Sequence, residues 1–205
     1  MQLFIDSNHL SPYAMSAFVV LREKDIPFEC VLIDLQGKAH LSDAYGRVST
    51  TLRVPSIIDD GFSLSESSAI CEYLDEKFDS VLVYPNDVQQ RAKAREIQAW
   101  LRSDLMAIRQ ERPTEVIFLK QQAQPLSVAG MDAANKLFSV AEKLIPDGQQ
   151  SLFDQWSIAD TDLALMLNRL ISASDSVPPR LLQYAQVQWQ RPSVQEWVNM
   201  PRPAC

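Results

Sequence analysis

The chain has 205 residues, which suits one large domain or two small ones, and its apolar fraction of 46% is sufficient for a hydrophobic core. The net charge of −7 argues against a protein that binds nucleic acids or anionic membranes, because no basic surface offsets it. The N-terminus lacks the pattern of a secretory signal peptide and no apolar run is long enough to span a membrane, so we expect a cytoplasmic protein.

Cysteine and histidine are scarce in this chain. The three cysteines, Cys30, Cys71 and Cys205, are scattered and odd in number, which suits a reducing compartment and predicts neither a disulfide framework nor a zinc site. With only His9 and His40 available, a histidine-based catalytic triad or a multi-histidine metal site is not expected either. We therefore predict that the protein uses no metal.

The first 80 residues predict an alternation of short strands and helices. The helix between the first two strands requires a parallel crossover, whereas the turn 59–61 allows the last two strands to form an antiparallel hairpin. The sequence contains no glycine-rich phosphate-binding motif, so a dinucleotide-binding sheet is not expected. The predicted strands are Leu3–Ile5, Phe28–Ile33, Pro55–Ile58 and Phe62–Leu64, and the predicted helices are Pro12–Lys24 and 65–78, the latter with Ala69, Ile70, Tyr73, Leu74 and Phe78 on one face.

From about residue 86 onward the sequence predicts helices almost throughout. One long helix carries an apolar stripe formed by Ile97, Trp100, Leu101, Leu105 and Ile108, and further helices are predicted at Val128–Ile145, at Ile158–Ile171 and after Pro178 and Pro192. We therefore predict an α+β protein: a domain of residues 1–80 with a mixed four-stranded sheet and helices, a linker of residues 81–86, and an all-α helical bundle of residues 87–205.

Ser11 lies directly before Pro12 at the start of the first predicted helix, in the stretch HLSPYAMS. A serine here is a favourable N-cap, and proline is favoured at the first helical position. The hydroxyl could also take part in chemistry, although the stretch lacks the partners of a serine nucleophile. Tyr13 is a competing hydroxyl donor, but inside the first helical turn we expect a wall or core aromatic.

Two further stretches carry candidate ligand-binding groups. Val54-Pro55 enters a strand, where a trans proline would simply initiate the strand and a cis bond would turn the Val54 backbone outward to dock an extended peptide-like ligand. Ser65, Glu66 and Ser67 crowd a helix start, where a serine could cap the helix or the helix N–H groups could bind a ligand carboxylate. In the second case Glu66 could accept from a ligand ammonium.

Several stretches together resemble the glutathione transferases. RVPSIIDDGFSLSESSAICEYLDEKF resembles the core of the glutathione-binding domain, and GKAHLSDAYGRVSTTLRVP resembles theta-like members. SLFDQWSIADTDLALMLNRL resembles the family's helical-domain capping box, with Ser157 and Asp160 three residues apart. IQAWLRSDLMAIRQERPTEVIF is most similar to the bacterial YfcF-type subgroup. The resemblance implies a thioredoxin-like domain followed by an all-helical domain.

The resemblance also implies roles for individual residues. Ser11 falls on the serine that hydrogen-bonds the glutathione sulfur in serine-type members. Val54 falls on the residue whose backbone pairs with the cysteinyl part of glutathione, and Pro55 on the cis proline. Glu66 and Ser67 fall on the residues that hold the γ-glutamyl end. Glutathione would therefore be the cosubstrate.

Further positions are implied for the glycyl carboxylate and for the second substrate. Lys38, His40 and Arg53 fall near the glycyl carboxylate, and Asp104 falls on an acidic residue that reaches the partner subunit's glutathione in theta-like relatives. A pocket for a hydrophobic second substrate is expected between the domains, walled by His9, Leu10, Tyr13, Ile108 and Arg112.

We therefore predict a cytoplasmic, homodimeric glutathione transferase that activates the glutathione thiol through Ser11. The thiolate would react with a small electrophile, an organic peroxide or a disulfide. The alternative is a non-catalytic glutathione-binding or assembly module that kept the same fold. The joint presence of Ser11, Arg53, Val54-Pro55, Glu66 and Ser67 favours the enzyme, because a pure scaffold has no need for all of them.

Overall fold

The computed structural model describes residues 1–202, which form two compact units. Among the described residues, the first unit comprises Met1–Val83 and residues 196–202, and the second comprises Tyr84–Gln195. This division differs from the predicted 1–80 and 87–205 chiefly at the C-terminal end. There the buried indole of Trp197 packs on Phe18 of the first unit, with ring centroids 5.4 Å apart. Cys205 lies outside the described residues.

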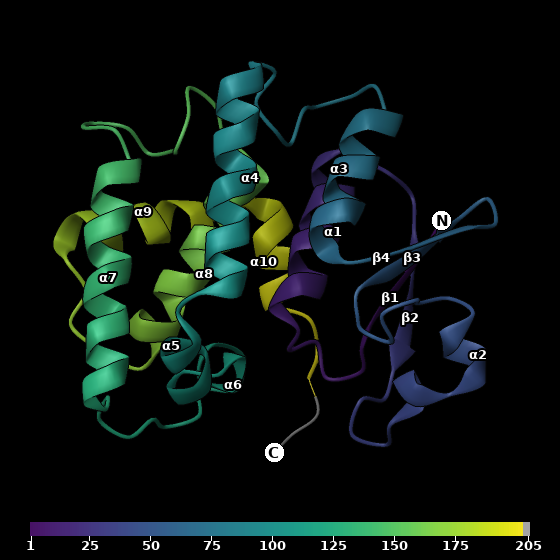
Figure 1. Ribbon diagram of the computed structural model, residues 1–205, viewed down its shortest axis with the longest axis horizontal. Coiled ribbons are helices and arrows are strands. Elements are labelled where there is room, and N and C mark those ends of the chain that lie inside the picture. Colours follow the sequence, from purple (N-terminus) through teal and green to yellow (C-terminus); the bar gives the residue numbers. More distant parts are fainter. Residues whose placement is uncertain (203–205) are drawn as a thin grey trace. The chain divides into compact units, whose positions relative to one another are not determined.

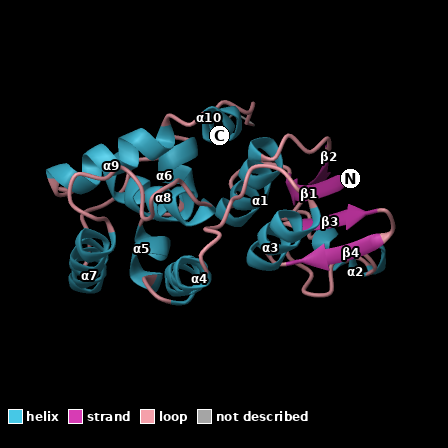
Figure 2. Ribbon diagram, turned by 90° about the horizontal axis from the view of Figure 1, so that it is seen from above, coloured by secondary structure: helices cyan, strands magenta, loops and turns pink. Residues whose placement is uncertain are grey.

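The first unit contains a four-stranded mixed sheet in the order β2-β1-β3-β4. The strands β1 and β2 are parallel, with Leu3 opposite Cys30, and β3 is antiparallel to both β1 and β4, with Ile57 opposite Leu64. Figure 2 shows β3 and β4 as arrows that point in opposite directions. The predicted crossover and hairpin are thus confirmed. The strands are β1 (Gln2–Asp6), β2 (Glu29–Ile33), β3 (Ser56–Asp59) and β4 (Phe62–Ser65).

The helices α1 (Pro12–Glu23) and α3 (Ser67–Lys77) lie together on one face of this sheet, and α2 (Asp43–Gly46) lies on the other (Figure 1). A 3₁₀ turn, η1 (Ala39–Leu41), precedes α2. Neither η1 nor α2 was expected from the sequence. In α1 the residues from Ala14 to Leu21 are all buried, so this helix is the centre of the unit's core.

The buried face of α3 differs from the predicted one. Ile70, Cys71 and Leu74 are buried, whereas Ala69 is exposed. Tyr73 is turned toward the β3–β4 hairpin, where its hydroxyl donates to Asp59 over 2.8 Å. Cys71 therefore takes a place on the buried face that the predicted pattern gave to Ala69.

The second unit consists of helices, with α8 in its middle, packed against α4, α6 and α9 (Figure 1). Nearly every residue of α8 is buried, and its start carries the predicted capping box, in which the Ser157 N–H donates to the Asp160 carboxylate over 2.8 Å. None of the described helices is long and apolar enough to cross a membrane. The helices are α4 (Val88–Ser103), α5 (Met106–Glu111), α6 (Thr114–Phe118), α7 (Val128–Leu144), α8 (Ile158–Ser172) and α9 (Pro179–Trp189). The division between the units falls within α10 (Pro192–Val198), after Gln195.

The predicted long helix with its stripe up to Ile108 is interrupted. Asp104 ends α4 and Leu105 adopts a left-handed conformation with φ 59°, after which α5 begins. The Asp104 carboxylate accepts the Leu105 N–H over 2.7 Å, which gives this donor a partner outside the helix. Leu105 and Ile108 are still buried, so the apolar stripe continues across a break that its periodicity does not reveal.

Candidate functional site

The loop between β1 and α1 positions Ser11. The Ser11 Oγ caps α1 by accepting the Ala14 N–H over 3.1 Å. The buried carboxylate of Asp6 accepts the N–H groups of Ser11 (3.0 Å) and Leu10 (2.6 Å), which fixes the backbone in front of the helix. Within residues 1–202, no acceptor takes the hydrogen of the Ser11 hydroxyl. This half-buried hydroxyl can therefore donate to a ligand at the positive end of α1.

The other candidate residues of this loop lie close to Ser11 in the chain. His9 has φ 52°, and its Nδ1 lies 2.9 Å from the Pro201 carbonyl oxygen. Leu10 and Tyr13 are half-buried, and Tyr13 lies in the first turn of α1, as predicted.

The corner before β3 is held by buried hydroxyl groups. The Val54-Pro55 peptide is cis, as the second of the two alternatives for this stretch requires, whereas the docking of a ligand on the Val54 backbone stays a prediction. The carbonyl of Arg53 accepts from the hydroxyls of Tyr45 (2.9 Å) and Ser49 (3.1 Å). Burial raises the pKa of the Tyr45 phenol, so it remains a donor at neutral pH. The backbone on either side of Val54 is thereby fixed from within the unit.

The corner between β4 and α3 carries Glu66 and Ser67. Glu66 has φ 74° and is the N-cap residue of α3, but its side chain makes no capping hydrogen bond. The expected serine cap is thus wrong: Ser67 is the first helical residue, and the Ser65 hydroxyl lies 3.3 Å from that of Ser49 instead. This contact joins the β4–α3 corner to the corner before β3.

The three basic candidates lie in or near the segment between β2 and β3. Lys38 and Arg53 have exposed side chains, and Lys38 is in a left-handed conformation with φ 60°. His40 is half-buried within η1, and its Nδ1 is buried with no hydrogen-bond partner in the described part of the chain. Two exposed cations and an unsatisfied imidazole nitrogen are suited to an anionic group.

The candidates in the second unit are engaged within that unit. Asp104 pairs with Lys136 and accepts from Trp100 Nε1 over 3.1 Å; the hydrogen bond from Lys136, followed by that from the Leu105 N–H, lowers the pKa of Asp104. Ile108 is fully buried. These contacts give Asp104 a structural role and make Ile108 a core residue.

Arg112 is also buried, with only 2% of its surface exposed. Its guanidinium forms a two-pronged ion pair with Asp175, at 2.6 Å from Nε and 2.8 Å from Nη2. This hydrogen bonding raises the pKa of Arg112 further. The charge of Arg112 is therefore paired, and its place in the wall of a substrate pocket stays a prediction.

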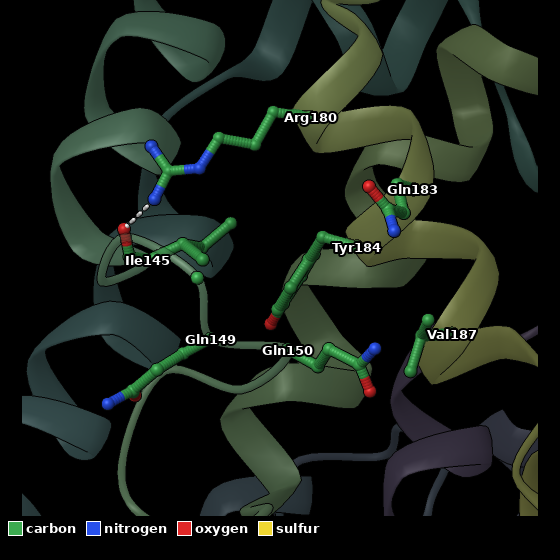
Figure 3. A pocket seen from close by; sticks show the side chains of 8 residues that line it. Ile145, Gln149, Gln150, Arg180, Gln183, Tyr184 and Val187 are labelled. Atoms are coloured by element: carbon green, nitrogen blue, oxygen red, sulfur yellow. Dashed lines mark hydrogen bonds between the residues drawn. The ribbon is translucent and has the colours of Figure 1, made fainter.

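Two cavities lie within the second unit. One, of about 260 Å³, opens beside α9, and no predicted site residue lines it (Figure 3). Its Arg180 guanidinium donates to the Ile145 carbonyl over 2.5 Å and pairs with Asp147, so its charge is used internally. The other, of about 320 Å³, is lined by Arg112 and by the loop after α6. The first cavity is lined by Ile145, Gly148, Gln149, Gln150, Arg180, Gln183, Tyr184 and Val187.

The two described cysteines lie on β2 and α3. Cys71 is buried in α3, and burial raises the pKa of the half-buried Cys30 thiol although Arg22 opposes this. The described residues contain no cluster of three or more potential metal ligands from His, Cys, Asp and Glu.

Sequence reasoning missed Asp6 and Arg202, which hold the Ser11 loop. Asp6 has a recognisable signal, since it is an acidic residue that ends an apolar strand directly before the loop. Arg202 donates to the His9 carbonyl over 3.1 Å from the other end of the chain, and nothing near it in the sequence indicates this contact.

Comparisons with known proteins give consistent results. Residues 7–82 match the family model "Glutathione S-transferase, N-terminal domain", and residues 87–202 match "Glutathione S-transferase, C-terminal domain". A glutathione transferase homologue from Burkholderia, solved with bound glutathione, is 44% identical; the match covers 96% of this chain and 95% of that chain, with a TM-score of 0.77. The bacterial YfcF-type subgroup stays a prediction.

Two further relatives are more distant. Mouse glutathione S-transferase theta-1 is 34% identical over 134 residues, which are 63% of this chain and 55% of that protein, so the match spans about half the length of this curated relative. A bacterial zeta-class maleyl pyruvate isomerase is 19% identical with a TM-score of 0.78 over the whole of both chains, and this similarity concerns the fold alone.

Proposed function

Since the chain belongs to the glutathione S-transferase family, we propose that it binds glutathione and stabilises its thiolate for reaction with a small electrophile, an organic peroxide or a disulfide. The observation that carries this proposal is the Ser11 hydroxyl, which caps α1 and keeps its hydrogen unused among the described residues. Glutathione bound to the Burkholderia homologue supports the choice of thiol.

The free energy required is within reach of this arrangement. A free thiol has a pKa of about 8.5, so only a few per cent is thiolate at neutral pH. Lowering this pKa by about two units requires roughly 2.7 kcal/mol of preferential thiolate stabilisation. A hydrogen bond to a charged group contributes about 1.5–3 kcal/mol, and a helix N-terminus about 0.3–1 kcal/mol.

Ser11 acts as a donor in this mechanism and never ionises. The Ala14 N–H that bonds to its Oγ withdraws electron density from the oxygen, which strengthens the hydroxyl as a donor. The sulfur of glutathione is the nucleophile, so a serine without a neighbouring histidine base is sufficient.

The remaining groups of the first unit are proposed to bind the tripeptide. The Val54 backbone would pair with the cysteinyl part, and Glu66 and Ser67 would hold the γ-glutamyl carboxylate and ammonium together with the N–H groups of α3. Arg53 and His40, with Lys38 beside them, would hold the glycyl carboxylate. These positive groups provide the local charge that an anionic ligand needs in an acidic protein.

The chemical step depends on the second substrate. With a carbon electrophile, the thiolate forms a C–S bond and the leaving group departs with its bonding electron pair. With an organic peroxide, the sulfur takes one oxygen, an alcohol leaves after protonation, and a second glutathione reduces the resulting sulfenic acid to water and glutathione disulfide.

We also propose that the protein is a homodimer. In that dimer Asp104, which pairs with Lys136 within its own subunit, would reach the partner's glutathione.

Titration calorimetry with glutathione, followed by assays with a halogenated nitroaromatic and an organic peroxide, tests this proposal. We expect glutathione to bind and at least one of the two reactions to be catalysed. Binding without turnover of either substrate, and without a lowered thiol pKa, would favour the non-catalytic module. A failure to bind glutathione would overturn the proposal altogether.

A further inference from the structure

The C-terminal segment 197–202 lies against the loop that precedes Ser11. The Arg202 guanidinium donates to the His9 carbonyl through Nη2 (3.1 Å) and Nε (3.3 Å), across 193 positions of the sequence. The Pro201 carbonyl oxygen lies 2.9 Å from the His9 Nδ1, and the Trp197 indole meets the His9 ring edge-on with centroids 6.1 Å apart. His9 and the segment 197–202 therefore form one contact region.

Arg202 is itself held in a single orientation. Besides the His9 carbonyl, its guanidinium donates to the carbonyls of Trp197 (2.9 Å), Val198 (2.7 Å) and Met200 (3.0 Å). The planar fork of five N–H donors can serve these acceptors at once, which the compact ammonium of a lysine cannot do. Burial lowers the pKa of Arg202, and the negative charge of Asp6 opposes this.

The loop needs such support because of its backbone. His9 has φ 52°, a left-handed conformation that is unfavourable for a residue with a Cβ and persists only where the surroundings hold it. On the β1 side, the Asp6 carboxylate holds the N–H groups of Leu10 and Ser11. On the other side, Arg202 holds the carbonyl of His9. Two opposite charges thus fix three consecutive residues that end at Ser11.

We propose that Arg202 is a positioning residue for Ser11: by holding the His9 carbonyl, it keeps the Ser11 hydroxyl where it can donate to the glutathione sulfur. This inference rests on the proposed function and extends it to a residue at the other end of the chain. Arg202 does not touch the reacting atoms in this account, and it acts through the loop 9–11.

The test measures the pKa of the glutathione thiol in the complex, from the ultraviolet absorbance of the thiolate against pH. For Arg202→Gln we expect this pKa to rise by about half a unit or more and kcat/KM to fall on the order of tenfold, as for one weakened hydrogen bond to a charged group. The KM for glutathione should change by less than about twofold, because the binding groups at Val54 and Glu66 are untouched.

Two further variants separate positioning from charge and from general loosening. Arg202→Lys keeps the positive charge but not the planar fork of donors, so we expect it to raise the thiol pKa as Arg202→Gln does. A wild-type thiol pKa in Arg202→Lys would overturn the proposal. This result is decisive even if Arg202→Gln does not fold. Arg22→Gln is the matched control, since it removes an exposed ion pair of 2.8 Å to Glu196 at the same end of the chain. An equal rise of the thiol pKa in Arg22→Gln would contradict the specific role of Arg202.

Hydrogen exchange of the ligand-free protein separates this inference from the proposed function. In Arg202→Gln the amide hydrogens of residues 9–11, 13 and 14 should exchange faster than in wild type, whether or not glutathione is activated. Unchanged exchange would overturn the inference and leave the proposed function intact. Faster exchange, with no lowered thiol pKa in the wild type, would support the structural contact and show that the proposed function is what fails.

Discussion

The Ala14 N–H donates to the Ser11 Oγ over 3.1 Å, and this one contact gives Ser11 two roles. The cap uses a lone pair of the oxygen, whereas thiolate stabilisation uses the hydrogen. The two roles are compatible, and each makes the other more effective, since a capped hydroxyl is held in place and polarised. The substitutions below separate them.

Stability tests the capping role of Ser11. Ser11→Ala should lower the free energy of unfolding by about 1 kcal/mol, whereas Ser11→Gly should lower it by only a few tenths, because glycine is a better N-cap residue than alanine. Urea unfolding followed by circular dichroism measures both. Equal losses in the two variants would show that the cap contributes little. Both variants lack the hydroxyl, so both should lose thiolate stabilisation.

Substitutions of Glu66 test whether the proposed glutathione site contains a strained backbone conformation. With φ 74° and ψ 120°, Glu66 lies outside the favoured regions for a residue with a side chain. Glu66→Gly should raise the free energy of unfolding by about 1 kcal/mol while weakening glutathione binding on the order of tenfold. Glu66→Gln is the control, since it keeps the strain and removes only the charge. Unchanged glutathione affinity in both variants, measured by calorimetry, would remove Glu66 from the site.

The environment of Asp59 leads us to predict that the free energy of unfolding depends on pH. Burial acts to raise the pKa of Asp59, but hydrogen bonds from Lys77 (2.5 Å) and Tyr73 outweigh it and hold this pKa below its ordinary value of 3.8. Because the native pKa is depressed, the carboxylate stabilises the fold above pH 3.8, and this contribution is lost as the pH falls through the native pKa.

At neutral pH the free energy of unfolding of Asp59→Asn should therefore be about 1 kcal/mol below that of wild type. This figure is kept low because Lys77 is partly exposed and solvent weakens its ion pair with Asp59. The difference should shrink as the pH falls below 3.8. Urea midpoints across this pH range measure it, with Asp60→Asn on the exposed turn as the control. A difference that is independent of pH would show that packing, and not the charge, accounts for the loss.

Arg112 is expected to contribute to stability and not to thiol activation. Arg112→Met breaks the buried pair with Asp175 and should cost about 3 kcal/mol of unfolding free energy. The double variant with Asp175→Leu should recover part of that loss, because no unpaired buried charge remains. The thiol pKa of bound glutathione should stay at its wild-type value in whichever variant folds. A raised thiol pKa would return Arg112 to the active site.

The regular elements were predictable because their signals are local. Ser11 with Pro12 marks the start of α1, and Ser157 with Asp160 three residues on marks the start of α8. The break between α4 and α5 was not predictable, since Leu105 takes a left-handed conformation for which glycine is the usual signal. Glu66 escaped prediction for the same reason, and so the expected serine cap of α3 was wrong.

The predicted site residues of the first unit came from short motifs, and the structure brings the corners around Val54 and Glu66 together through Ser49. Contacts between distant residues have no such signal. Arg112 and Asp175 are 63 positions apart, and a charged residue on a predicted helix does not indicate whether its partner is water or a buried carboxylate. The hydrogen bonds from Arg202 to the His9 carbonyl were missed for the same reason, because the two residues are far apart in the sequence.

The most direct test of this account is the pKa of the thiol of bound glutathione, measured from thiolate absorbance against pH in wild type and in Ser11→Thr, Ser11→Gly and Ser11→Ala. We predict a pKa about two units below the free value in wild type, a similar value in the threonine variant, and a rise of roughly one to two units where the hydroxyl is missing. An equally lowered pKa in all four proteins would contradict the central claim that the Ser11 hydroxyl stabilises the thiolate.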